Sequence, residues 1–349
     1  MSLLIALGLG LGLASPEAMP GPHHVDLSAK SFRTWKVELP TDAFRPVGDG
    51  IALPVDLGGL YKVEVLADGL MLDTDGDGVV DQKIVGTLDK VTGERTARAT
   101  LQKMGAEGSG PAYPIRLQNL GKGWTWACGG AQVGTQGDTK LAVFDANGNG
   151  RFNDVGEDAI TVGSGDIAML LGKTVYVGGH LHNLTVAADG SSLELVPFDG
   201  PTGTLNLESK MDSKGKLLSA LVVSEDGQQC FDLAGASAGL ALPTGTYHLH
   251  RGRLGLGNAT VQIDGTDMKP MVVEAGSSQQ VAWGSPVRAE FDYQREGSQI
   301  TFQPDQVWLT GAAGERYLGW SPIGKSPEFS IVERNLGTEI EKALFPGSC

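Results

Sequence analysis

Apolar and polar residues alternate with a period of two along many short stretches of this chain. Residues 61–66 and 287–293 show the pattern most clearly, and residues 184–195 carry it on both sides of an Asp-Gly turn. Because successive side chains of a strand point to opposite faces, such alternation predicts strands with one buried face. Asp-Gly turns, a second of which lies at 67–69, predict tight hairpins. The pattern therefore predicts an all-β protein built from several antiparallel, β-sandwich-like modules.

Breaks in this pattern divide the chain. Residues 3–13 are an apolar run of signal-peptide length, too short to span a membrane. A Pro- and Gly-rich stretch at 197–203 is the clearest domain boundary. Helix is expected only as a single turn at 166–171 and as a short segment at 339–345, which Thr338 would cap. The expected parts are a signal peptide (1–14), a linker (15–30), an N-terminal β domain (31–200), a β-sandwich (201–275) and a β module with the short C-terminal helix (276–349).

The amino-acid composition agrees with an all-β fold and excludes several classes of binding partner. Glycine accounts for 51 of 349 residues, about twice the usual ~7 %, as expected for a chain rich in turns. The chain has 27 Lys and Arg against 41 Asp and Glu, a formal net charge of −14. Nucleic acids and anionic membranes need a basic surface, so neither is an expected partner. Together with the apolar N-terminal run, this balance indicates a secreted, periplasmic or cell-surface protein.

The strongest candidate for chemistry is an acidic loop at residues 73–81. Three Asp residues alternate in it, a glycine occupies its sixth position, and a fourth Asp its ninth. Such crowding of negative charge is unfavourable unless a cation neutralises it, and Ca²⁺ prefers carboxylate and carbonyl oxygens. We therefore predict a calcium site. Its expected ligands are the side chains of Asp73, Asp75, Asp77 and Asp81 and the carbonyl of Val79.

A second loop, at residues 145–154, repeats the arrangement with amides in place of three carboxylates. Amide oxygens also ligate Ca²⁺, so a second calcium site is predicted there. For both loops the alternative is an Asp-Gly turn with solvated charge, and the second loop has fewer charges to favour an ion. The expected ligands are Asp145, Asn147, Asn149, the carbonyl of Arg151, Asn153, and Asp154 or Asp158.

Both loops resemble the DxDxDG calcium-loop superfamily, which includes the EF-hand. The EF-hand places ligands at positions 1, 3, 5, 7 and 9, glycine at 6 and a bidentate Glu at 12. Position 12 is Ile84 in the first loop and Gly156 in the second, so both depart from the pattern at the closing ligand. Because strands flank the loops where an EF-hand has helices, the ion is expected to lock structure rather than to switch it.

Weaker resemblances concern the second half of the chain. Residues 242–249, Leu-Pro-Thr-Gly-Thr-Tyr-His-Leu, resemble the strand entry of prealbumin-like β-sandwiches, and the strand-rich segment 276–349 is similar to immunoglobulin-like modules. As a whole the chain resembles uncharacterised secreted bacterial proteins with EF-hand-like loops. The resemblance implies a structural or interaction role, with a protein or polysaccharide surface as partner.

No catalytic constellation is predicted, although several residues are of types that could form one. The pairs His180/His182 and His248/His250 each share a strand face and would suit a transition metal in a hydrolase, provided that a carboxylate joined them. Residues 235–239 match the GxSxG nucleophile motif, but a small-residue loop is expected because a proline follows soon after. A carbohydrate-binding module, marked by exposed Trp or Tyr on one sheet face, is the alternative function. One disulfide is conceivable among Cys128, Cys230 and Cys349.

Overall fold

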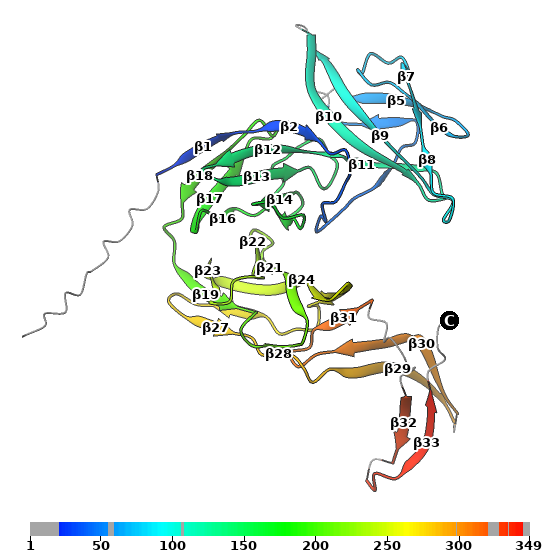
Figure 1. Cartoon of the computed structure of the whole chain (residues 1–349), viewed down its shortest axis with the longest axis vertical. Coiled ribbons are helices and arrows are strands. Elements are labelled where there is room, and N and C mark those ends of the chain that lie inside the picture. Colours follow the sequence, from blue (N-terminus) through cyan, green and yellow to red (C-terminus); the bar gives the residue numbers. More distant parts are fainter. Residues whose placement is uncertain are drawn as a thin grey trace, which may run out of the picture.

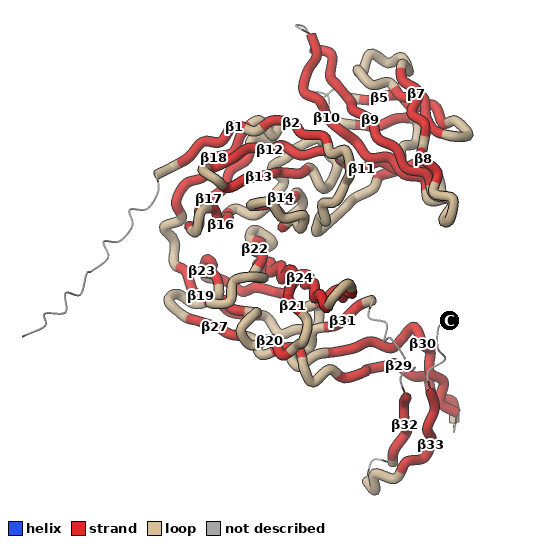
Figure 2. Tube along the Cα trace, in the orientation of Figure 1, coloured by secondary structure: helices blue, strands red, loops and turns tan. Residues whose placement is uncertain are grey.

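A computed structural model describes residues 21–54, 59–105, 108–297, 299–319, 328–333 and 335–344. All the regular secondary structure in these residues is β, and they contain no helix, which confirms the predicted all-β, multi-sheet fold (Figure 2). The expected signal peptide at 1–14 lies outside the described residues. The part of the chain that the structure describes also holds no helix that could span a membrane.

The chain up to residue 197 forms four antiparallel sheets, drawn in the upper part of Figure 1. Their apolar faces share one large core that runs from Val25 to Leu195. A smaller cluster around Phe144 includes Leu39 and, partly buried, Trp35. In sheet order the strands are β1 (His23–Asp26), β18 (Ser192–Pro197), β17 (His180–Val186) and β16 (Thr174–Val177); β3 (Arg45–Pro46), β11 (Trp124–Cys128), β10 (Gly108–Asn119), β9 (Arg95–Gly105) and β8 (Thr87–Leu88); β15 (Met169–Leu170), β14 (Ala159–Val162), β13 (Thr139–Phe144), β12 (Gly130–Gln136) and β2 (Ser28–Ser31); and β4 (Gly50–Ala52), β5 (Leu60–Val65), β6 (Gly69–Leu72) and β7 (Gln82–Val85).

The chain from residue 202 onward forms a second set of sheets around its own core, which runs from Leu205 to Trp283. One large antiparallel sheet dominates it, and β26 (Met271–Val273) pairs with β24 beside the main path of that sheet. The strands of the large sheet are, in order, β22 (Cys230–Asp232), β21 (Lys216–Ser224), β24 (Gly245–Leu256), β25 (Ala259–Asp264), β31 (Arg316–Leu318), β30 (Gln299–Thr310) and β29 (Arg288–Glu296). The smaller sheets are β23 (Leu240–Pro243), β19 (Thr202–Asn206) and β27 (Ser278–Gln280); β20 (Met211–Asp212) and β28 (Trp283–Gly284); and the hairpin of β32 (Glu328–Val332) and β33 (Glu339–Leu344).

The hairpin that carries the first acidic loop shows how the sequence pattern becomes structure. In β5 the side chains of Tyr61 and Val63 are buried, whereas Lys62 between them and Glu64 after them are exposed. The Asp-Gly turn then leads into β6, whose Leu70 and Leu72 are fully buried. Strand alternation therefore fixes which face of this sheet enters the core, as the sequence predicts.

Three local predictions are wrong. The expected linker 15–30 contains β1 and β2, which pair with β18 and β12. The segment 339–345, expected to be a short helix, begins with the strand β33, because its backbone groups pair with β32. The helical turn expected at 166–171 instead contains the two-residue strand β15, which pairs with β14. In each case pairing with another strand, whether near or distant in the sequence, overrides local propensity.

The expected division at residue 275 does not coincide with a break between sheets. Strand β27 pairs in parallel with β19, where Thr204 lies opposite Ser278, and β28 pairs in parallel with β20. In the large sheet β31 pairs with β25, where Ile263 lies opposite Tyr317. Residues 201–275 and 276–319 therefore share sheets and do not form separate prealbumin-like and immunoglobulin-like modules.

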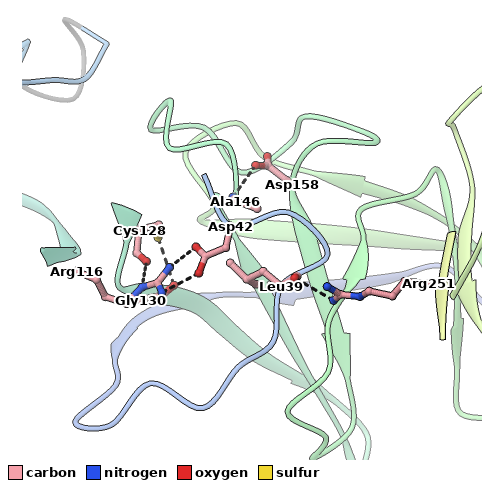
Figure 3. Close-up of polar contacts among 8 residues, drawn as sticks. All are labelled: Leu39, Asp42, Arg116, Cys128, Gly130, Ala146, Asp158 and Arg251. Atoms are coloured by element: carbon pink, nitrogen blue, oxygen red, sulfur yellow. Dashed lines mark hydrogen bonds and ion pairs between the residues drawn. The ribbon is translucent and has the colours of Figure 1, made fainter. Parts of the chain in front are cut away.

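A loop that leads from β2 towards β3 joins the two halves of the chain. Its Glu38 forms ion pairs with Arg251, at 3.4 Å, and with Arg253, both on β24. The Arg251 side chain also donates to the carbonyl of Leu39 at 3.1 Å, a contact visible in Figure 3. Further along the same loop Asp42 pairs with Arg116 on β10. Residues 33–44, hereafter the crossing segment, thus contact the sheets of both halves.

The two cysteines among the described residues are free thiols. Cys128 and Cys230 are both buried and are not joined to each other. Burial raises the pKa of each thiol to about 12, so neither is a reactive nucleophile. The third cysteine, Cys349, lies outside the described residues.

Candidate metal centre

The first acidic loop connects β6 to β7, as the sequence predicts. Asp73 follows β6 directly and is fully buried, whereas Asp75 is half-buried and Asp77 is exposed. The backbone amide of Asp73 donates to the carbonyl of Lys62 on β5 at 2.9 Å, and that of Gln102 on β9 donates to the carbonyl of Thr74 at 2.7 Å. The start of the loop is thus held by strands on both sides.

Hydrogen bonds within the loop hold the three carboxylates. The two oxygens of Asp73 accept from the backbone amides of Gly76, at 2.7 Å, and Gly78, at 2.9 Å. Asp75 and Asp77 each accept from the amide two residues further on, at 3.2 and 2.7 Å. Gly76 and Gly78 both have positive φ, 75° and 89°, a conformation that side chains disfavour.

These contacts bring carboxylate oxygens of Asp73, Asp75 and Asp77 within 4.8 Å of one another. At about 4 Å each pair of like charges repels by on the order of 1–4 kcal/mol, depending on the local dielectric. The donor set consists of hard oxygens only, which suits Ca²⁺ or a similar hard cation and does not suit a soft metal. The residues present therefore fit the predicted ion.

The other two predicted ligands lie on the far side of the loop. Both oxygens of Asp81 accept from the side-chain hydroxyl of Thr74, at 3.1 and 2.8 Å, and one also accepts from its backbone amide. Asp81 therefore closes the loop by hydrogen bonding, and its carboxylate is partly engaged before any ion binds. Val79 donates its amide to Asp77, which leaves its carbonyl oxygen as the only group it can offer a cation.

No carboxylate takes the closing position of an EF-hand. Ile84 is buried on β7, opposite Leu70. Two further acids near this hairpin are engaged elsewhere: Asp68 pairs with Lys83 at 3.6 Å, and Asp89 accepts from the backbone amides of its own turn. Remaining coordination at the first loop would have to come from backbone carbonyls and water.

The second loop connects β13 to β14 and has the same start. Asp145 is fully buried and accepts from the backbone amides of Asn149, at 3.1 Å, and Gly150, at 2.5 Å. The Tyr113 hydroxyl, on β10, donates to its second oxygen at 2.5 Å. Burial raises the pKa of Asp145, and these donors oppose that rise. The local sequence gives no sign of this contact, because Tyr113 lies 32 residues before its partner.

In the second loop, however, hydrogen bonds from amide groups compensate the negative charge of the carboxylates. The side-chain NH₂ groups of Asn147 and Asn149 both donate to one oxygen of Asp154, at 3.1 and 2.5 Å. Asp158 is fully buried and accepts from the amides of Ala146, at 3.1 Å (Figure 3), and Asp154, at 2.8 Å. Burial, with the nearby charges of Asp145 and Asp154, raises the pKa of Asp158 to about 8.

The last two predicted ligands of the second loop contribute little to its centre. The amide of Arg151 donates to the side-chain oxygen of Asn149 at 2.7 Å, which leaves the Arg151 carbonyl as its only available ligand group. Asn153 is exposed and lines a hollow of about 390 Å³ together with Lys173 and Thr185. The second loop is therefore a hydrogen-bonded network with few uncompensated charges.

The remaining candidates do not assemble into a site. Among the described residues, Asp73, Asp75 and Asp77 form the one group of three or more His, Cys, Asp or Glu side chains close enough to hold a metal. His182 is buried on β17 with its ring nitrogen against the carbonyl of His180, while His248 and His250 lie on β24 in another sheet. The GxSxG stretch forms a turn before β23 and no helix follows it, as expected.

Comparison of the chain with protein-family models, with curated proteins and with solved structures finds no match in any of the three.

Proposed function

We propose that this chain is an exported, calcium-stabilised β protein with a structural or interaction role, and that the first acidic loop is its calcium site. The observation that carries the proposal is the approach of three carboxylates, those of Asp73, Asp75 and Asp77, to within 4.8 Å of one another. The carbonyl of Val79 and the carboxylate of Asp81 complete the proposed set. The apolar run at 3–13 supports export.

The position of the loop supports a stabilising ion rather than a regulatory one. The first two residues of the loop are hydrogen-bonded to β5 and β9, and Leu72 just before it is fully buried. An ion that holds Asp73, Asp75 and Asp77 would therefore tie the turn to a hairpin that is already packed. No helix pair flanks the loop to open when the ion binds, as the helices of sensor EF-hands do.

At the second loop calcium binding stays a prediction, and we expect it to be weaker. An ion at its centre would have to replace the hydrogen bonds that Asn147 and Asn149 donate to Asp154. That exchange offsets part of the gain from coordination. The two loops should therefore differ in affinity although they are similar in sequence.

Thermal unfolding in excess Ca²⁺ and in chelator tests the proposal. At a calcium concentration of about 100 times the dissociation constant, one site adds about 2.7 kcal/mol to the free energy of unfolding. The double variant Asp75→Asn/Asp77→Asn should lose most of this gain, because two of the charged ligands become neutral. Asp89→Asn is the matched control, since it removes a charge from a turn with no metal role.

Isothermal titration with Ca²⁺ then assigns the ion to a loop. The expected result is one tight site that the Asp75→Asn/Asp77→Asn variant removes. If chelator leaves the melting temperature unchanged and no heat of binding is seen, the first loop is a turn and the proposal is wrong.

A further inference from the structure

A hollow of about 480 Å³ lies against the sheet of β8, β9 and β10, where the crossing segment passes over it. Its volume falls within the range of about 300–1,000 Å³ that is usual for small-molecule sites. On the strand side, Thr96 pairs with Thr87 and with Gln118, and Arg98 pairs with Arg116. Paired residues of neighbouring strands point to the same face of a sheet, so these five side chains form one polar floor.

Arg98 and Arg116 lie directly opposite each other in the strand register, and two like charges in this arrangement cost free energy unless they are compensated. Arg116 is compensated. It forms two hydrogen bonds to Asp42, a third to the carbonyl of Cys128 (Figure 3), and lies 3.8 Å from the ring centre of Trp35. Only 11 % of its side chain is exposed.

Arg98 has no such compensation. It is exposed, and its one hydrogen bond to a described residue goes to the carbonyl of Arg33 on the crossing segment. No carboxylate among the described residues pairs with it, so most of its five N–H donors make no hydrogen bond to a described residue. The positive charge of Arg98 belongs to a chain whose formal net charge is −14. The two acids nearest to it in the crossing segment, Glu38 and Asp42, are already paired with other arginines.

The rest of the lining offers neutral polar groups and aromatic rings. The hydroxyls of Thr87 and Thr96 and the side-chain amide of Gln118 make no hydrogen bond to any described residue. Phe44 and Trp35 supply the wall formed by the crossing segment. A ligand that fits this set carries one carboxylate for Arg98, several hydroxyls for the Thr and Gln side chains, and a hydrocarbon edge for the rings.

We propose that this hollow, hereafter the arginine groove, binds a carboxylate-bearing sugar, that is, a uronic acid unit of a polysaccharide. The carboxylate would form a bidentate pair with Arg98, as guanidinium groups favour. The sugar hydroxyls would contact Thr87, Thr96 and Gln118. The carboxylate also relieves the repulsion between Arg98 and Arg116. The groove does not include any residue of the acidic loops, so this inference stands apart from calcium binding.

Isothermal titration of the full chain with short oligogalacturonate and short alginate fragments tests the inference. A neutral galactan fragment of equal length is the matched ligand. All titrations are made in chelator, because Ca²⁺ can bridge carboxylates of such sugars to acidic loops. The variants are Arg98→Gln and Thr96→Ala in the groove, and Arg288→Gln, which replaces another exposed arginine in the other half of the chain, as control.

The expected result is that a uronate fragment binds, that Arg98→Gln weakens it about tenfold or more, that Thr96→Ala weakens it less, and that Arg288→Gln leaves it unchanged. Equal binding of the neutral galactan would overturn the inference, and so would failure of both uronate fragments to bind. Binding of inorganic phosphate or of an acidic peptide at Arg98 without the uronates would likewise overturn it, since the site would then select an anion and not a sugar. The thermal test for calcium is read separately, so either idea can fail alone.

Discussion

Replacing Arg116 by Met tests whether the crossing segment is held by one buried cation. The guanidinium lies between the crossing segment and β10, with hydrogen bonds to Asp42 and to the carbonyl of Cys128. It also lies 3.8 Å from the ring centre of Trp35 and 5.0 Å from that of Phe44. Methionine keeps much of the hydrocarbon stem but none of these polar contacts.

The magnitude follows from these contacts. A charge-assisted pair contributes about 1.5–3 kcal/mol, and we take the lower half because 35 % of the Asp42 side chain is exposed. The bond to the Cys128 carbonyl adds roughly 0.5–1.5 kcal/mol and the cation–π contact about 0.5–1 kcal/mol. Arg116→Met should therefore lower the free energy of unfolding by roughly 2.5–4.7 kcal/mol.

Urea denaturation followed by tryptophan fluorescence measures the change, and Arg98→Met is the matched control. Arg98 sits opposite Arg116 in the same strand pair but is exposed, so its replacement should stay within about 0.5 kcal/mol. In a double-mutant cycle with Asp42→Asn, the Arg116–Asp42 coupling should be about 1–2 kcal/mol. Equal effects of the two Met variants, or a coupling near zero, would refute the reasoning.

Three further predictions concern single contacts. His24 interacts with the carboxylates of Glu194 and Asp26, of which Glu194 has the larger effect, and both raise the pKa of His24 above 6.5. Protonation of His24 therefore stabilises the folded state. This contribution is fully present below about pH 6.5 and is lost as the pH rises through the raised pKa. An NMR titration should show this, with the value returning towards 6.5 in Glu194→Gln. Tyr113→Phe removes the hydroxyl donor of the buried Asp145 and should cost about 1–3 kcal/mol in urea unfolding; an unchanged midpoint would show that the bond is dispensable. Gly69→Ala would place a methyl group 1.9 Å from a main-chain oxygen of β7, so its melting temperature should fall well below that of wild type, and a wild-type value would contradict this packing.

Much of the local fold can be predicted from the sequence, because a strand with one buried face has alternating apolar and polar residues. Residues 61–66 and the turn at 67–69 illustrate this, since Tyr61 and Val63 are buried in β5 as the pattern requires. Partner choice cannot be predicted in this way. No local pattern in residues 339–345 indicates that they pair with β32. Likewise, no local pattern near residue 275 indicates that β27 pairs with β19.

The same distinction between local pattern and distant pairing applies to the candidate sites. The first acidic loop is local, so the spacing of Asp73, Asp75 and Asp77 was enough to predict that they cluster. The arginine groove was missed because it combines the crossing segment with Arg98 and Arg116, whose pairing is set by strand register. An isolated arginine in a sequence gives no sign of whether a partner neutralises it.

The parallel pairing of β19 with β27 and of β20 with β28 has a consequence for biosynthesis. Strands near residues 204 and 212 find their partners only after residues 278–284 have left the ribosome. The second half of the chain must therefore remain incomplete during translation until at least residue 284, with one edge of β19 unpaired and prone to association in the interval. The first half has no such delay across residue 200, since all its sheets are complete by β18. A nascent chain stalled between these two points would carry a finished N-terminal half and an open sheet edge, so chaperone contacts should concentrate there.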